Sequence, residues 1–221
     1  FGVWDDVMFR NAAEYMATLQ QPFFGFLFPS STHHPFSVPH LKWESDASSD
    51  REGRYKNSLR YSDSTLGEFF TMVRERGMFG NTVFIVTADH VSGVRQGDIP
   101  MPQRFSLPCL LIAPGLEPGV DERTCSQLDI GPTIIDLCGW KLPHASLGTS
   151  LLAAENGRGA IMATEHEVLR KEGEQWLVHN LDRVLTKTDG EGIAGMEKKL
   201  LATVQVVHNL LRTNRVIPPP D

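Results

Sequence analysis

Two short apolar segments, FFGFLF at residues 23–28 and TVFIVTA at residues 82–88, limit the folds open to this chain. They are rich in aromatic or β-branched side chains and too short for helices, which predicts two buried strands. Apolar residues spaced by three and four positions predict a helix between them, over about residues 52–76. Further elements are expected at 5–19 (helix), 105–113 (strand) and 129–137 (helix). This alternation predicts an α/β fold with a mostly parallel sheet flanked by helices.

Acidic residues stand where two of these helices begin. Asp5 or Asp6 is the expected N-cap of the first helix and Asp129 that of the third, since a carboxylate there accepts hydrogen bonds from backbone N–H groups. Gly77 and Gly139 follow the expected ends of the second and third helices. Capping residues therefore support the helix limits that the apolar spacing predicts.

The pattern of the sequence changes from Ala160 onwards. Short alternating stretches separated by turn residues predict a small antiparallel meander. A final helix is expected from about Met196 to Leu211, with its apolar residues on one face. We therefore divide the chain into an α/β part, residues 1–155, and a C-terminal meander plus helix, residues 156–221.

Charge and hydropathy exclude several classes of protein. Lys+Arg number 21 against 27 Asp+Glu, and the net charge of −6 over 221 residues argues against a nucleic-acid partner. The apolar runs fall well short of the roughly 20 residues of a membrane-spanning helix, so no transmembrane segment is expected. No signal peptide is apparent, and the chain begins at Phe1 rather than at Met, so we expect a fragment or a processed form.

Three cysteines, Cys109, Cys125 and Cys138, form no CxxC pair and no spacing typical of a zinc site. We expect them to be small buried apolar residues. A disulfide between Cys109 and Cys125 in an oxidising compartment is the alternative, and the sequence leaves it open.

Histidines follow the carboxyl ends of both expected strands. THHP at residues 32–35 comes after the first strand, and Asp89 and His90 come directly after the second. In open α/β sheets, functional sites form beyond the carboxyl ends of the strands, so these two segments are expected to share one site.

Asp89 and His90 offer a carboxylate and an imidazole to a metal ion. Mixed oxygen and nitrogen ligands suit Mn²⁺, Zn²⁺ or Fe better than Ca²⁺. The imidazoles of His33 and His34 are able to bind a phosphate or to protonate a leaving oxygen. The alternatives, a capping Asp beside a surface His and two loop histidines exposed to water, stay open on the residues alone.

Six segments occur together in one order along the chain. They are PFFGFLFPSSTHHPFSVP, YKNSLRYSDSTLGEFF, TVFIVTADHVSG, RFSLPCLLIAPGL, SQLDIGPTIIDLCG and LGTSLL. As a co-linear set over roughly residues 1–152, they resemble the C-terminal half of the catalytic domain in the sulfatase-like branch of the alkaline phosphatase superfamily. The resemblance is strongest to the lipoteichoic acid synthases and related membrane-anchored phosphoglycerol transferases.

The resemblance implies roles for particular residues. Asp89 and His90 match the metal ligands of the TADH motif, which hold a divalent cation: Mn²⁺ in the synthases, with Mg²⁺, Zn²⁺ or Ca²⁺ as alternatives. His33 matches the histidine of an H-x-P motif that binds the transferred phosphoryl group, so it is the expected catalytic residue. His34 falls where the family varies and is a weaker candidate for substrate binding. The chain departs from the family at Val91, where many members have Gly.

The resemblance also implies what lies outside the chain. The family's nucleophile, a threonine in the phosphotransferases, and another carboxylate ligand stand upstream of the H-x-P motif, so we expect no nucleophile in these residues. The expected partner is therefore the N-terminal half of the same domain, and the chain alone should be inactive. The implied location is the extracytoplasmic face of a bacterial membrane.

Three functions follow from this reading. The first is a metal-dependent phosphoglycerol transferase or phosphodiesterase that acts on a lipid head group. The second is a sulfatase, a sulfuric ester hydrolase with a formylglycine nucleophile; many sulfatases carry Asp-Asn where this chain has Asp89-His90, which favours phosphate as the substrate. The third is a non-catalytic remnant of the fold, which would bind no metal at Asp89 and His90.

Overall fold

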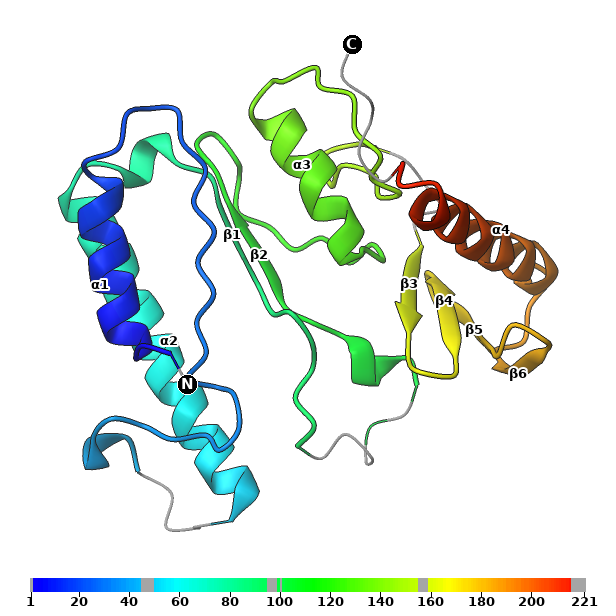
Figure 1. The fold of residues 1–221 in the computed structure, drawn as a ribbon, viewed down its shortest axis with the longest axis horizontal. Helices are drawn as coiled ribbons and strands as arrows, with labels where there is room; N and C mark the ends of the chain where they lie inside the picture. Colours follow the sequence, from blue (N-terminus) through cyan, green and yellow to red (C-terminus); the bar gives the residue numbers. More distant parts are fainter. Residues whose placement is uncertain (1, 45–49, 95–98, 100, 155–158, 216–221) are drawn as a thin grey trace. The chain divides into compact units, whose positions relative to one another are not determined.

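The computed structural model describes the chain apart from residues 1, 45–49, 95–98, 100, 155–158 and 216–221. The chain forms two compact units (Figure 1). Unit 1 comprises Phe1–Pro100 and Leu107–Glu117, and unit 2 comprises Met101–Ser106 and Pro118–Asp221. The predicted boundary between residues 155 and 156 lies outside the described residues.

Unit 1 contains the two longest helices predicted for the α/β part. α1 spans Asp5–Met16 and α2 spans Arg51–Glu75. The Asp50 carboxylate caps α2 by accepting a hydrogen bond from the Gly53 N–H at 2.7 Å. Gly77, with φ of +71°, follows α2 in the left-handed conformation that suits glycine. Both limits of α2 therefore fall within one residue of those expected.

The start of α1 differs from the prediction. Trp4 occupies the N-cap position and its side chain makes no capping hydrogen bond. Asp5 lies one residue further on, fully buried, and accepts hydrogen bonds from the backbone of Ser30 and Ser31. The predicted capping role of Asp5 and Asp6 is wrong, because distant backbone and side-chain donors compete for these carboxylates.

α1 and α2 lie side by side (Figure 1) and share the main core of unit 1. On α2, apolar residues at helical spacing point to this core. The ring of Phe69 packs on that of Phe9, with centroids 5.1 Å apart. Leu27, from the extended segment that follows α1, packs against the same cluster. The buried members are Phe9, Ala13, Phe69, Val73, Met78 and Phe84.

The sheet of unit 1 differs from the expected one. β1 (Phe84–Thr87) pairs with β2 (Cys109–Ile112) in antiparallel register. The chain reverses between the two strands, and Thr87 Oγ1 donates a hydrogen bond to the Pro108 carbonyl at 2.9 Å where they meet. Residues 23–28 are extended but belong to no strand ladder in the described chain. The predicted mostly parallel sheet is therefore not confirmed.

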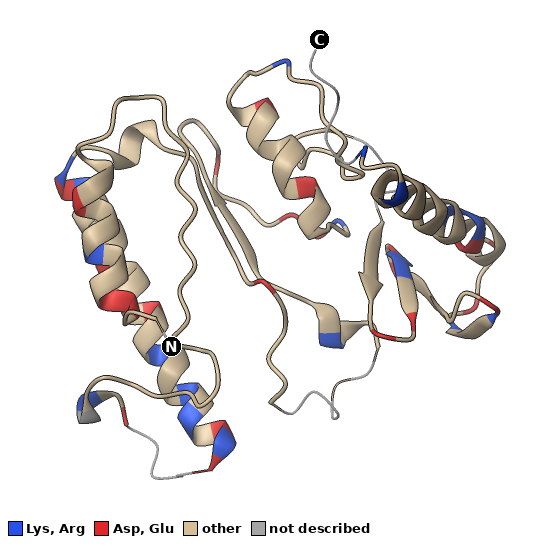
Figure 2. Cartoon of the chain, viewed as in Figure 1, with Lys and Arg blue, Asp and Glu red and all other residues tan. Residues whose placement is uncertain are grey.

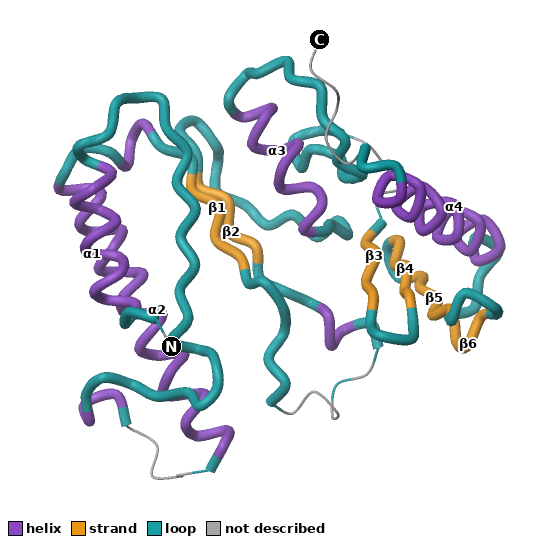
Figure 3. The backbone as a smooth tube through the Cα atoms, viewed as in Figure 1, coloured by secondary structure: helices purple, strands orange, loops and turns teal. Residues whose placement is uncertain are grey.

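Unit 2 contains the predicted meander and final helix (Figure 3). Its four strands pair in sequence order, each antiparallel to the next. They are β3 (Ala160–Ala163), β4 (Val168–Glu172), β5 (Gln175–His179) and β6 (Val184–Lys187). α4 (Ile193–Arg212) packs on the meander through a core of Leu177, Ile193, Met196 and Leu200. The antiparallel subregion is confirmed.

The third predicted helix also belongs to unit 2. α3 (Ile130–Leu137) follows the 3₁₀ turn η5 (Gln127–Asp129). Asp129 occupies the N-cap position of α3, as predicted, but its side chain makes no capping hydrogen bond to that helix. Ser126 caps the preceding turn: its Oγ accepts from the Leu128 N–H at 3.3 Å. Asp129 instead closes the capping box by accepting from the Ser126 N–H at 2.8 Å.

Acidic and basic side chains are interspersed along α1, α2 and α4 (Figure 2). Among the described residues, none of the helices is both long and apolar enough to cross a membrane. The three cysteines are exposed, and no disulfide joins Cys109 to Cys125. The expectation that the cysteines are buried is wrong, because the start of β2, the loop at Cys125 and the end of α3 lie at the surface of their units.

Candidate functional site

Both predicted site segments lie in unit 1. The extended residues 23–28 and strand β1 run in the same direction (Figure 1), and both contribute apolar side chains to one core through Leu27 and Phe84. The THHP loop follows the end of the first, and Asp89 and His90 follow the end of the second. The fold of unit 1 thus directs both histidine-bearing segments towards the same end of the unit.

Asp89 and His90 lie against each other. The Asp89 Oδ1 atom accepts a hydrogen bond from the His90 N–H at 2.8 Å. His90 Nδ1 lies 2.9 Å from the Val91 carbonyl oxygen, which can only accept, so Nδ1 carries the proton. In the neutral ring, the lone pair is then on Nε2, which lies 3.5 Å from Asp89 Oδ2. The exposed fractions of the two side chains are 72% for His90 and 52% for Asp89.

This geometry fits a divalent cation. Metal-binding histidines commonly donate one ring N–H to a backbone carbonyl, which leaves the other nitrogen to the metal, and His90 has this arrangement. A carboxylate oxygen and an imidazole nitrogen on neighbouring residues supply two ligands of the type that Mn²⁺ and Zn²⁺ accept. In the described part of the chain, no group of three or more His, Cys, Asp or Glu gathers to complete a site.

The loop that carries His33 is a pair of tight turns. The His33 N–H donates to the Ser30 carbonyl at 3.0 Å, and the Phe36 N–H donates to the His33 carbonyl at 2.8 Å. His33 Nδ1 lies 2.9 Å from the His34 carbonyl oxygen, so this ring also carries its proton on Nδ1. Nε2 of His33 therefore accepts a hydrogen bond when the ring is neutral and donates one when the ring is protonated.

His34 is oriented differently from His33. Its ring packs edge-on against Phe36, with centroids 5.7 Å apart, and both histidines are exposed. Phe36 is buried and packs in turn on Tyr55 of α2, at 5.3 Å between centroids. The ring of His34 thus lies over the apolar residue that fixes the end of the loop.

Tyr61 of α2 organises the start of α1 beside this loop. Its hydroxyl donates to Asp6 Oδ1 at 2.6 Å and accepts from the Asp6 N–H at 3.1 Å. Burial, together with this hydrogen bond, raises the pKa of Tyr61 above its ordinary value of 10.0. The ring of Trp43 packs edge-on against Tyr61 at 5.6 Å, which gives Trp43 a covering role in the loop.

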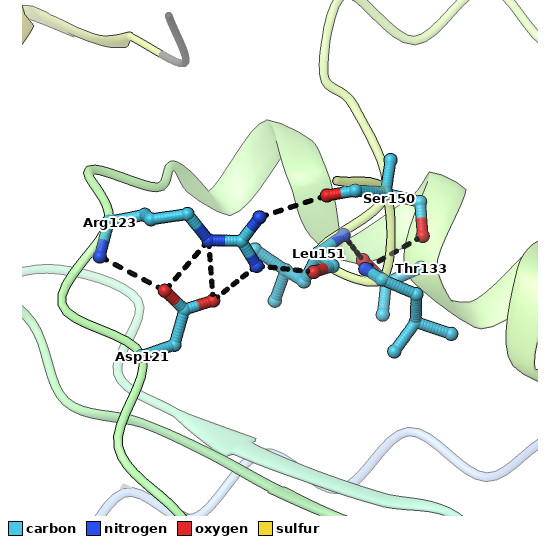
Figure 4. A network of polar contacts seen from close by, with 7 residues as sticks. Asp121, Arg123, Thr133, Ser150 and Leu151 are labelled. Carbon is cyan, nitrogen blue, oxygen red and sulfur yellow. Dashed lines mark hydrogen bonds and ion pairs between the residues drawn. The ribbon is translucent and has the colours of Figure 1, made fainter. Parts of the chain in front are cut away.

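In unit 2, side chains of residues 129–133 (sequence DIGPT) bind the backbone of a neighbouring loop. Asp129 Oδ1 accepts from the Thr149 N–H at 2.7 Å, and Thr133 Oγ1 accepts from the Leu151 N–H at 2.8 Å. Arg123 donates to the carbonyls of Leu151 and Ala153 while Asp121 holds its guanidinium (Figure 4). These side chains bind backbone of their own unit, which is a structural role.

The family follows from a comparison with family models. Residues 1–140, more than half of the chain, match the family described as Sulfatase. The chain therefore belongs to the Sulfatase family, and the predicted resemblance is confirmed.

Individual relatives place the chain more narrowly. It is 28% identical over 177 residues to the lipoteichoic acid synthase of Staphylococcus saprophyticus, a match that covers 70% of this chain and 27% of the relative. Its fold matches that of an alkaline phosphatase superfamily protein from Vibrio parahaemolyticus, with a TM-score of 0.83 at 24% identity, over 99% of this chain and 57% of that one. It also matches the lipoteichoic acid synthase LtaP from Listeria monocytogenes, with a TM-score of 0.72 at 20% identity, over 100% of this chain and 62% of that one.

These comparisons define an alkaline phosphatase-like fold and a Sulfatase-family domain related to lipoteichoic acid synthases. The chain spans about a quarter of the length of the curated relative and less than two thirds of either solved structure.

Proposed function

We propose that the full-length protein is a metal-dependent phosphoglycerol transferase or phosphodiesterase that acts on a lipid head group. The observation that carries this proposal is the pairing of a carboxylate and an imidazole lone pair, 3.5 Å apart, directly after β1. The similarity to lipoteichoic acid synthase supports phosphoglycerol as the transferred group. The corresponding location is the extracytoplasmic face of a bacterial membrane.

Asp89 and His90 would hold the cation through Oδ2 and Nε2, with Mn²⁺ as the first candidate and Mg²⁺, Zn²⁺ or Ca²⁺ as alternatives. When bound, such a cation lowers the pKa of a coordinated hydroxyl and neutralises charge on phosphoryl oxygens. The Val91 carbonyl keeps the His90 ring in the tautomer that exposes Nε2. This part of the chain thus contributes ligands that are oriented before the cation arrives.

His33 would contact the phosphoryl group itself. In its protonated form, Nε2–H donates a hydrogen bond to a phosphoryl oxygen, while Nδ1–H stays on the His34 carbonyl. In the reaction that we propose, a threonine hydroxyl outside these residues attacks phosphorus, the lipid alcohol leaves with the proton of that hydroxyl, and a glycerophosphothreonine forms. An acceptor hydroxyl or water then attacks the same phosphorus and takes the glycerophosphate, while its proton returns to the threonine oxygen.

We propose that the rest of the catalytic domain covers one face of residues 23–28. Phe24, Phe26 and Phe28 alternate along this segment with exposed fractions of 71%, 76% and 59%, while Leu27 packs inward. The rings of Phe26 and Phe28 stack at 6.2 Å, so the face is contiguous. A contiguous aromatic face of this kind marks an interaction surface. The matched structures extend well beyond the region that they share with this chain. This supports a partner within the same domain.

The match to the Sulfatase family favours a second candidate, a sulfatase. Its substrate would be a sulfate ester, and its nucleophile would be a modified Cys or Ser outside these residues. A non-catalytic remnant is the third outcome of the test below.

The test uses the full-length protein with purified phosphatidylglycerol and a sulfate ester as alternative substrates. His90→Ala should remove most of the bound metal, measured by elemental analysis, and nearly all turnover. His33→Ala should keep the metal and lose on the order of 100-fold or more in turnover, the range for a lost oxyanion donor or general acid. His34→Ala is the matched control on the same loop and should lose much less.

Other results would support a different function or reject one of these residue roles. Turnover of the sulfate ester alone would support the sulfatase. Unchanged metal content in the His90→Ala variant would reject the metal site, and absence of metal from the wild type would favour the remnant. A greater loss in His34→Ala than in His33→Ala would reject His33 as the phosphoryl contact. The isolated 221-residue chain should show no turnover.

A further inference from the structure

We propose that Asp5, on the first turn of α1, is a positioning residue that sets the place of the His33 loop. This inference rests on the proposed function, because it concerns how His33 reaches the phosphoryl group. Asp5 is fully buried, and it lies 28 positions before His33 in the sequence.

Asp5 joins three parts of unit 1 through one carboxylate. Its Oδ1 accepts from the N–H groups of Ser30 and Ser31, both at 3.1 Å. Its Oδ2 accepts from Ser62 Oγ of α2 at 2.9 Å. Hydrogen bonds to an ionised acceptor are stronger than those between neutral groups, and the burial of Asp5 keeps water from replacing them. The loop is therefore tied to both helices at one point.

The hydrogen bonds to Asp5 are made by residues that form the turn before His33. Ser30, whose N–H bonds to Asp5, accepts the His33 N–H at its carbonyl, 3.0 Å away. On the other side, the Phe36 N–H bonds to the His33 carbonyl, and Phe36 is buried against Tyr55. His33 is thus held between a polar anchor on α1 and an apolar anchor on α2. Displacement of a catalytic group by about 1 Å can reduce turnover about 100-fold, so a lost anchor should affect the rate.

Asp6, the next residue, provides a matched control. It accepts from the Tyr61 hydroxyl at 2.6 Å, so Tyr61→Phe removes a strong hydrogen bond at the same turn of α1. That change leaves the Asp5 bonds to Ser30 and Ser31 in place. A general loss of stability in this region should therefore appear in both variants, whereas a displaced His33 loop should appear only when Asp5 is changed.

The experiment measures kcat, KM, metal content and amide hydrogen exchange of residues 29–36 in the full-length protein, well below its unfolding temperature. Asp5→Ala should lower kcat by about 10- to 100-fold with little change in metal content, and should speed exchange in 29–36. Tyr61→Phe should do neither. Asp5→Asn should stay within about threefold of wild type, because the amide oxygen accepts from Ser30 and Ser31 while its NH₂ donates to Ser62.

A double-mutant cycle separates positioning from stability. In a His33→Ala background, Asp5→Ala should cause almost no further loss of kcat, because the group that it positions is already gone. If Asp5→Ala does not fold, Asp5→Glu replaces it: the extra methylene displaces the loop, and the same loss of kcat is expected.

Two outcomes overturn the inference, and they differ from failure of the proposed function. Equal kcat in Asp5→Ala and Tyr61→Phe would refute the positioning role, as would a full further loss in the His33→Ala background. Unchanged turnover in His33→Ala alone would instead refute the proposed role of His33, and with it the reason for positioning that loop.

Discussion

Removal of the Tyr61 hydroxyl should destabilise the chain at neutral pH, by a free-energy difference that shrinks in alkali. Tyr61 is buried, and its hydroxyl donates to Asp6 Oδ1 at 2.6 Å and accepts from the Asp6 N–H at 3.1 Å. A hydrogen bond to a charged group contributes about 1.5–3 kcal/mol. The side chain of Asp6 is 28% exposed, so water can replace the lost donor and the lower end applies. Tyr61→Phe should therefore reduce the free energy of unfolding by about 1.5 kcal/mol at pH 8.

The alkaline behaviour follows from the direction of the pKa shift. The pKa of Tyr61 is raised in the folded chain, first by burial and then by the hydrogen bond to Asp6, whereas the unfolded chain has the ordinary value of 10.0. The resulting stabilisation is fully present below pH 10 and is lost as the pH rises towards the pKa of Tyr61 in the folded chain. Relative to Tyr61→Phe, the free energy of unfolding of the wild type falls by at most about 0.4 kcal/mol at pH 10 and about 1.4 kcal/mol at pH 11. These are upper limits because solvent around Asp6 screens its charge.

Urea unfolding between pH 8 and pH 11 measures this difference. The ring centroids of Trp4 and Trp43 lie 6.3 and 5.6 Å from that of Tyr61, so two of the four tryptophans report on this region by fluorescence. The stability gap between wild type and Tyr61→Phe should narrow from about 1.5 kcal/mol towards zero as the pH approaches 11. Tyr15→Phe, which removes an exposed hydroxyl, should follow the wild type throughout. A gap that stays constant from pH 8 to pH 11 would refute the reasoning, since Tyr61 would then titrate alike in both states.

Two further predictions concern packing and are measured by the same urea unfolding. Phe69→Ala should reduce stability by about 3–5 kcal/mol, because the ring is buried between Phe9 and Phe84; a loss below about 1 kcal/mol would contradict its place in the core. Gly148→Ala should reduce stability by about 1–3 kcal/mol, because a Cβ there would meet the Leu128 carbonyl, whereas Gly131→Ala, with open space around it in α3, should be neutral or stabilising. Equal effects of the two alanines would contradict the close approach at Gly148.

The helices could be predicted from the sequence because their signals are local. Apolar spacing of three and four along α2, with Asp50 before it and Gly77 after it, encodes both the limits and the buried face. The meander and α4 are predictable for the same reason, since each strand pairs with its neighbour in sequence. The pairing of β1 with β2 was not predicted, because an apolar run of four residues carries no information about the direction of its partner.

The candidate site could be predicted only in part. His33, His34, Asp89 and His90 stand out because each follows an apolar segment, but their roles remain predictions. Asp5 was interpreted as an N-cap, because its real partners lie 25, 26 and 57 positions away. No local pattern distinguishes a carboxylate that caps its own helix from one that binds a distant loop.

The two halves of the candidate site are stabilised in different ways, which makes their failures separable. His90 is oriented by contacts within residues 89–91, at the end of β1. The His33 loop is tied to α1 through Asp5 and to α2 through Phe36 and Tyr55. Loss of the Asp5 contacts should therefore reduce turnover while metal binding persists, whereas loss of the His90 imidazole should remove both the metal and the turnover. A chemical step that needs both a bound cation and a correctly positioned His33 imidazole would then depend on two separate sets of contacts. One set lies within residues 89–91, and the other joins the His33 loop to Asp5 and Phe36.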